Sequence, residues 1–115
     1  MAAYRAGARK RRQQQEAMLS ARHLRARKLA ENAADLLKTE FGAVQVLVFG
    51  SVTEPAHFHA RSDLDLAAWG IEEELYLRAV GRLMSLDSQF LVDLVRMEEA
   101  PDTLRAMIEQ TGVSL

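Results

Sequence analysis

The strongest constraint on how this chain folds is the stretch from Val44 to Leu66. It opens with a run of β-branched and large apolar residues, V-Q-V-L-V-F, that stops at Gly50-Ser51. Such a run predicts a buried strand that ends in a tight turn. A second apolar run, Leu64 to Trp69, starts beside Asp63 and contains Asp65. Because alternate residues of a strand point to one face, we expect the two carboxylates to lie together.

These residue types indicate a site for phosphate and metal. Two neighbouring carboxylates repel each other and stay ionised most easily around a cation. Their hard oxygen atoms suit Mg²⁺, which keeps water and substrate phosphates in its remaining positions. A Gly-Ser turn lets a backbone approach a phosphate closely. Each signal alone is weak, since such turns are common and an Asp-x-Asp pair also caps helices or ends solvated strands.

Asp93 strengthens this interpretation. It interrupts the apolar run F-L-V-D-L-V-R-M, where we expect it to be buried. A buried acid is costly unless it is paired or bound to a metal. If the strands that contain Asp65 and Asp93 are parallel, their positions in those strands allow the two to lie side by side.

The predicted order of elements is α-β-(short α)-β-α-β-α, which makes an α/β (α+β) fold. The connection between the second and third strands contains a helix, as in a parallel crossover, and the shorter link after the first strand allows an antiparallel turn. The expected elements are a helix from about Gln13 to Phe41 that stops at Gly42, strands at 43–49, 63–69 and 90–97, a helix that starts at the acidic run 72–74, and a last helix from Pro101 to Gly112.

Charge divides the chain into two parts. Residues 1–28 contain nine Lys or Arg and one Glu, a net charge of +8, whereas residues 29–115 have a net charge of −9. We therefore expect a basic N-terminal arm that continues into the first helix, followed by one domain at 29–115. The first turns of that helix should project or fray. The arm is able to grip nucleic acid, but with Tyr4 as its one aromatic residue a partner-binding or solvated surface is the commoner explanation.

Composition excludes several classes of protein. The chain has 115 residues and no cysteine, which rules out disulfides and thiolate metal sites and fits a cytoplasmic location. The longest apolar runs fall short of the roughly 20 residues that span a bilayer.

Three motifs together resemble a known family. V-F-G-S, S-D-L-D-L and L-V-D-L-V are similar to the three-part signature of the DNA polymerase β-like nucleotidyltransferase superfamily, over about Ala43 to Gly112. The size resembles its minimal nucleotidyltransferase (MNT) branch. The resemblance implies a three-stranded mixed sheet flanked by helices and Mg²⁺-dependent transfer of a nucleoside monophosphate from a nucleoside triphosphate. It also implies frequent pairing with a HEPN-domain toxin, for which the MNT protein is the antitoxin.

The resemblance also implies roles for single residues. Gly50 and Ser51 would hold the triphosphate tail, and Asp63 and Asp65 would bind two magnesium ions. Asp93 would bind the ion that activates the acceptor hydroxyl, and would take its proton.

One departure from the family bears on nucleotide binding. Many members read G-S-x-A-R-G, whereas this chain reads G-S-V-T-E-P. That sequence places Glu54 near the phosphates and leaves Arg61 as the nearest basic substitute.

Two functions stay open on these grounds. The first is a Mg²⁺-dependent enzyme that moves AMP from ATP to a hydroxyl of a partner protein, as antitoxin to a HEPN-type toxin. Such an enzyme could also form a homo-oligomer. The alternative is a weakly active or inactive relative that masks a partner protein by binding it. The intact acids favour the enzyme, and the G-S-V-T-E-P departure favours the binding module.

Overall fold

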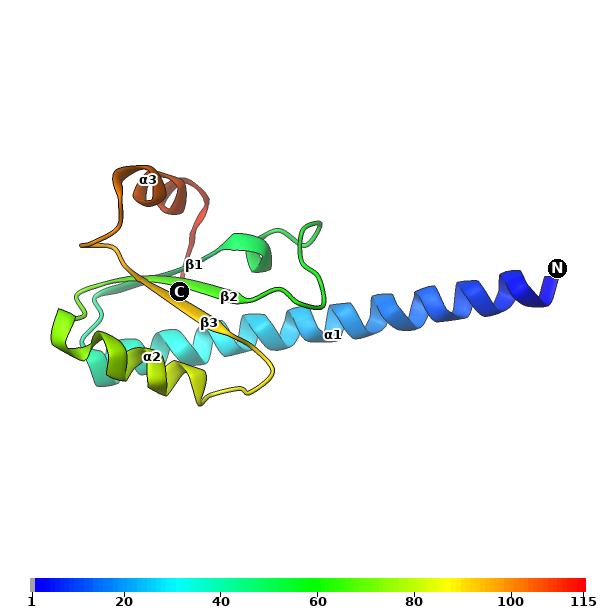
Figure 1. Ribbon diagram of the computed structural model, residues 1–115, viewed down its shortest axis with the longest axis horizontal. Coiled ribbons are helices and arrows are strands. Elements are labelled where there is room, and N and C mark those ends of the chain that lie inside the picture. Colours follow the sequence, from blue (N-terminus) through cyan, green and yellow to red (C-terminus); the bar gives the residue numbers. More distant parts are fainter. Residues whose placement is uncertain (1) are drawn as a thin grey trace.

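A four-stranded mixed sheet lies at the centre of the computed structural model, which describes the backbone of residues 2–115 and the side chains from Arg5 onward (Figure 1). The strand order is β3-β2-β1-β4. β1 is antiparallel to β2 and to β4, whereas β2 and β3 are parallel. The strands are β1 (Gln45–Phe49), β2 (Leu64–Trp69), β3 (Val92–Arg96) and β4 (Val113–Ser114).

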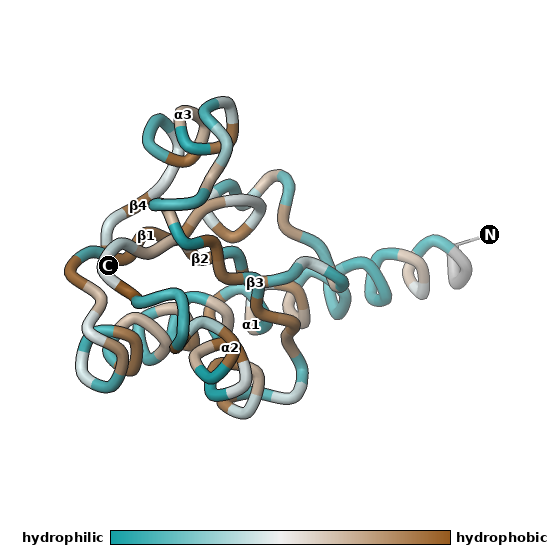
Figure 2. Tube along the Cα trace, turned by 60° about the vertical axis from the view of Figure 1, so that its left-hand side comes forward, coloured by the Kyte–Doolittle hydropathy of each residue, from teal (hydrophilic) through white to brown (hydrophobic). Residues whose placement is uncertain are grey.

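Helices cover both faces of the sheet. α1 (Ala2–Phe41) and α2 (Tyr76–Met84) pack on one face, and α3 (Asp102–Thr111) packs on the other (Figures 1 and 2). The chain also has two 3₁₀ turns: η1 (Gly50–Thr53) follows β1, and η2 (Glu73–Leu75) precedes α2. The predicted α/β (α+β) class and the mixed sheet are therefore confirmed.

Period-two alternation divides the strand residues between two cores. Val46, Val48, Leu64 and Leu66 face α1 and α2 and are among the buried residues of that side. Leu47, Phe49 and Ala67 face α3, where they form a smaller cluster with Ile108 and Met97. By the same alternation Asp65 and Asp93 belong to the α3 face.

The first helix is longer than the sequence predicts. It starts at Ala2, not near Gln13, and projects from the domain as helix throughout its described length. Its buried stripe begins only at Ala26 and runs to Phe41. Met18 and Leu24, two apolar residues before this stripe, are 73% and 68% exposed. The helix ends as predicted, because Gly42 adopts φ +76° and Ala43 N–H bonds back to Leu37 O at 3.0 Å.

Three predicted details are wrong. The sheet has a fourth strand, β4, whose two residues immediately after α3 are too few to give a pattern. The acidic run 72–74 leads into the 3₁₀ turn η2, and α2 begins only at Tyr76. β2 starts at Leu64, so that Asp63 stands just before it. None of the helices described between residues 2 and 115 is both long and apolar enough to cross a membrane.

Candidate active site

The predicted pairing of two acids is confirmed by the strand register. β2 and β3 are parallel, and Asp65 is the direct register partner of Asp93. On the other side of β2, Phe49 at the end of β1 is the register partner of Asp65. The turn that follows β1 therefore adjoins the same acids. All of these groups lie at one end of the sheet, where β1 ends and β2 and β3 begin. We call this the acid edge: Gly50, Ser51, Asp63, Asp65 and Asp93.

Asp65 is the central acid of this edge. Its side chain is half-buried, and that burial raises the pKa of its carboxyl above the ordinary value of 3.8. The nearby carboxylates of Asp93 and Asp63 raise the pKa further, in that order. The structure therefore brings the three acids close enough to repel one another. A bound cation would offset both the burial and the repulsion, because it stabilises the ionised form of each acid.

Asp93 is exposed, which contradicts the prediction that it is buried. β3 is an edge strand of the sheet, and α3 packs over Ala67 and Met97 at the other end of the same face. The apolar neighbours Val92 and Leu94 point to the α1 and α2 side instead. The run of apolar letters around Asp93 is thus the signature of one buried face, while Asp93 itself faces solvent.

Gly50 is required by its conformation and by Asp65. Its φ of +79° lies in the left-handed region that favours glycine. A Cβ added at this position would overlap Asp65 Oδ2. The glycine therefore allows the turn to lie directly against the central acid. Ser51 is half-buried in the same turn, which Thr53 Oγ1 stabilises by donating to Gly50 O at 2.7 Å.

The loop from Glu54 to Ser62 contains the sequence departure. Glu54, whose side chain is half exposed, pairs with His57 Nδ1, so its charge has a partner within its own turn. Arg61 is exposed, and its backbone N–H donates to His59 Nδ1 at 3.1 Å. Within the described residues its guanidinium forms no ion pair. The structure therefore does not bring Arg61 onto the acids.

The acid edge fits magnesium, although it is not a finished cage. Among residues 2–115, no three His, Asp or Glu side chains converge as a ready-made metal site. Mg²⁺ does not need one, because it commonly binds one or two carboxylates and fills its other positions with water and phosphate oxygens. The paired carboxylates of Asp65 and Asp93, with Asp63 beside them, supply that kind of donor set.

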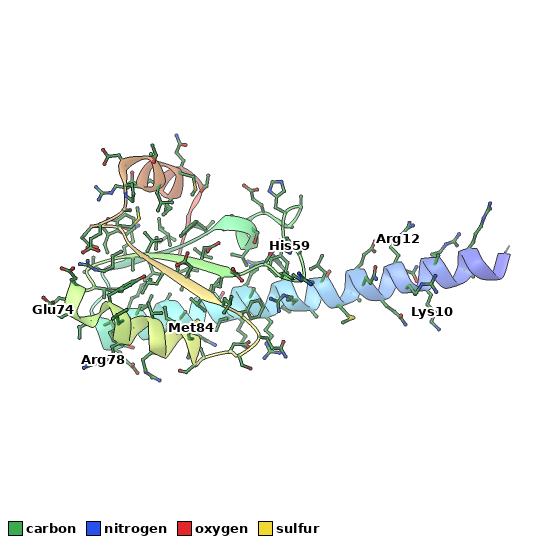
Figure 3. All side chains as sticks on the ribbon, viewed as in Figure 1. Lys10, Arg12, His59, Glu74, Arg78 and Met84 are labelled. Atoms are coloured by element: carbon green, nitrogen blue, oxygen red, sulfur yellow. The ribbon has the colours of Figure 1, made fainter. Side chains whose placement is uncertain are left out.

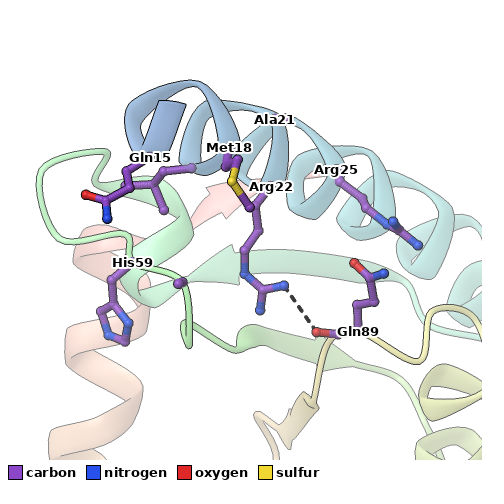
Figure 4. Close-up of a pocket in the computed structure, with 9 residues that line it drawn as sticks. Gln15, Met18, Ala21, Arg22, Arg25, His59 and Gln89 are labelled. Carbon is purple, nitrogen blue, oxygen red and sulfur yellow. Dashed lines mark hydrogen bonds between the residues drawn. The ribbon is translucent and has the colours of Figure 1, made fainter. Parts of the chain in front are cut away.

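Sequence reasoning missed the part of α1 that contacts the loops beside the acid edge. Arg22 donates hydrogen bonds to the loops before β2 and β3, and His23 donates one to the turn after β1. Their partners are 29 to 67 residues away in the chain, so no local pattern signals these contacts. A cavity of about 690 Å³ lies beside Arg22, between α1 and the same loops (Figure 4).

Comparisons with known proteins agree with the fold. The family model for polymerase beta, nucleotidyltransferase matches residues 31–115. A solved structure of a candidate minimal nucleotidyltransferase is 34% identical, with 80% of this chain and 92% of that chain covered and a TM-score of 0.57. A comparison with curated proteins gives no match.

Two further structures share the fold at lower identity. A toxin–antitoxin complex with AMP-PNP is 24% identical over 73% of this chain and 70% of that chain, with a TM-score of 0.63. Another is a chain of the complex between a tri-AMPylated Shewanella oneidensis HEPN toxin and MNT antitoxin. It is 18% identical, with 77% of this chain and 70% of that chain covered and a TM-score of 0.60. The match of the family model over residues 31–115 and the 34% identity together show that this chain belongs to the polymerase β nucleotidyltransferase family.

Proposed function

We propose that this protein is a Mg²⁺-dependent nucleotidyltransferase that moves AMP from ATP to a hydroxyl group of a partner protein, as the antitoxin of a HEPN-type toxin. The observation that carries the proposal is the acid edge: Asp65 and Asp93 are register partners, and Asp63 and the Gly50-Ser51 turn adjoin them. Such an edge offers carboxylates for a cation and backbone groups for a phosphate at one place.

The chemistry assigns a role to each group. Asp63, Asp65 and Asp93 would hold two magnesium ions, which when bound lower the pKa of the acceptor hydroxyl and neutralise phosphate charge. The Gly50-Ser51 turn would hold the triphosphate tail, with Arg61 as the nearest basic side chain. Asp93, exposed at the edge strand, is open to an incoming macromolecule. The acceptor oxygen would bond to the α-phosphorus, and the bond from the α-phosphorus to the oxygen that bridges to the β-phosphate would break. Pyrophosphate would leave, and the hydroxyl proton would pass to Asp93.

Solved relatives support the choice of substrate and partner. One holds AMP-PNP, and another is a HEPN toxin that bears three AMP groups in complex with its MNT antitoxin. The acids of the present chain lie on a partly open face, because α3 covers only one end of it. An open face accommodates the surface of a protein better than a small alcohol, which needs enclosing walls.

The test is transfer of labelled AMP. The chain is incubated with α-labelled ATP, Mg²⁺ and the HEPN-type protein expected from the neighbouring gene. We expect the partner to be labelled by the parent and by Asp35→Asn, a matched change at an exposed acid of α1. Asp65→Asn should reduce labelling about 100-fold or more, because the substitution removes a charged ligand from the reacting centre. Efficient labelling of an aminoglycoside by the chain alone would contradict a protein acceptor.

The alternative is a binding module that masks its partner without transferring AMP. The observation that favours it is Glu54, a carboxylate that directly follows the turn where phosphate would bind. Its pairing with His57 reduces that objection, since a neighbouring cation offsets the charge when His57 is protonated. A stable complex that forms equally with the parent and with Asp65→Asn, and in which no AMP is transferred, would identify the binding module.

A further inference from the structure

One turn of α1 contacts every segment that forms the acid edge. Arg22 and His23 reach the turn after β1, the loop before β2 and the loop before β3. Arg25, one turn on, pairs with Asp87 in the loop before β3, with Nε to Oδ2 at 2.6 Å. All three residues precede residue 31, where the match to the family begins.

Arg22 joins the two loops that lead into the acid-bearing strands. One terminal nitrogen of its guanidinium donates to Gln89 O at 3.2 Å (Figure 4). The other donates to Ser62 O, also at 3.2 Å. Its guanidinium carbon also lies 4.0 Å from the centre of the Phe90 ring. Ser62 immediately precedes Asp63, and Gln89 and Phe90 lead into β3 and Asp93. One side chain therefore spans the entry to both acids.

His23 secures the third segment. Its Nε2–H donates to Val52 O at 2.8 Å, within the turn η1 that contains Gly50 and Ser51. Its ring also meets Phe58 edge to face, with a centroid distance of 4.8 Å. Phe58 is buried and anchors the loop between Glu54 and Asp63. The turn η1 and the loop between Glu54 and Asp63 are thus both held against α1 at His23.

We infer that Arg22 and His23 are positioning residues, which hold the three segments of the acid edge in the arrangement that binds Mg-ATP. The part of this inference that concerns Mg-ATP rests on the proposed function. A planar guanidinium that donates in two directions while stacked on a ring fixes the distance between its two partners, and a single ammonium does not. Displacement of Asp63 relative to Asp65 and Asp93 by even 1 Å would impair shared ligation of a cation.

The test combines hydrogen exchange with nucleotide binding. Arg22→Ala is compared with Arg12→Ala, which removes the same charge from the exposed, projecting part of α1 (Figure 3). Without nucleotide, we expect faster exchange in Arg22→Ala at the amides of Phe58, Ser62, Leu64 and Phe90, which bond within and between the two loops. The amides of β1, and those of β2 after Leu64, should not change. Mg-ATP affinity, measured by calorimetry, should fall about tenfold or more.

A conservative variant separates positioning from charge. Arg22→Lys keeps the positive charge but loses the two-way donation, so its exchange rates and its affinity should lie between those of the parent and Arg22→Ala. His23→Ala should accelerate exchange at Phe58 and leave the amides near Phe90 unchanged, because His23 touches only the first two segments.

Each outcome decides one of the two claims. Loop exchange in Arg22→Ala equal to that in Arg12→Ala would overturn the inference, as would faster exchange with unchanged Mg-ATP affinity. If the parent itself binds no Mg-ATP, the proposed function fails. The exchange data would then still decide whether Arg22 and His23 hold the three segments together.

Discussion

Asp65 is the residue on which burial and charge act most strongly at the acid edge. Its pKa is raised above 3.8, first by burial and then by Asp93 and Asp63. A carboxyl whose pKa is higher in the folded than in the unfolded state stabilises the fold while protonated. That contribution is complete below pH 3.8 and is lost as the pH rises through the raised pKa.

The pH dependence of Asp65→Asn follows from this sign. In the presence of a chelator, the stability of the variant relative to the parent should increase as the pH rises from below 3.8 to 7. Urea denaturation at a series of pH values measures this difference. Asp35→Asn is the control and should show no such trend. A gap between Asp65→Asn and the parent that is independent of pH would contradict this account of the acid edge.

Gly50 gives a second prediction at the scale of one residue. Gly50→Ala places a Cβ against Asp65 Oδ2 at φ +79°, so the free energy of unfolding should fall by about 1 to 3 kcal/mol. Gly81→Ala is the matched control, because Gly81 lies in α2 with open space around it. That change should stabilise the protein by about 0.5 to 1 kcal/mol. A Gly50→Ala variant as stable as the parent would show that the turn does not press on the acid.

Among the elements, α1 has two parts with different physical support. The part from Ala26 to Phe41 buries its apolar stripe, and the turn at Arg22 to Arg25 binds the loops. The residues before Gln15 have no such contacts in the described side chains, which begin at Arg5. A helical segment of that length is marginal by itself in water. The family match likewise begins inside α1, at residue 31.

Truncation separates these two parts. Deleting residues 2–14 should change the melting temperature by less than about 2 °C, because none of the side chains described between residues 5 and 14 is buried. Deleting residues 2–25 should lower it by about 5 °C or more, since Arg22, His23 and Arg25 are lost with their partners. Thermal denaturation followed by circular dichroism measures both. Equal melting temperatures for the two deletions would contradict a structural role for Arg22 to Arg25.

For the whole molecule, the separation of charge suggests how a partner is attracted. Residues 1–28 have a net charge of +8, and Lys10 and Arg12 extend from the projecting part of α1 (Figure 3). Exposed charge of one sign accelerates association with an oppositely charged surface and is screened by salt.

Salt dependence tests whether the projecting helix recruits the toxin-like partner. Replacing the basic residues from Arg9 to Arg12 with Gln should slow association about tenfold at low salt. The difference from the parent should shrink towards zero at about 0.5 M salt. Stopped-flow mixing with the HEPN-type protein measures both rates. Association that is independent of salt and of these residues would exclude electrostatic recruitment by the arm.

The sequence by itself determined three of the four strands and the glycine turn, and it indicated that Asp65 and Asp93 pair. Each of these depends on a local pattern: period-two alternation, a glycine after an apolar run, and a helical crossover between two strands. The tertiary structure alone decided how exposed each acid is. Asp93 lies in an apolar run, yet it faces solvent because β3 is an edge strand and α3 packs at the other end of its face. The fourth strand and the contacts of Arg22 and His23 also depended on tertiary structure. Both join residues far apart in the chain, and only the packing of α1 and α3 against the sheet brings those residues together.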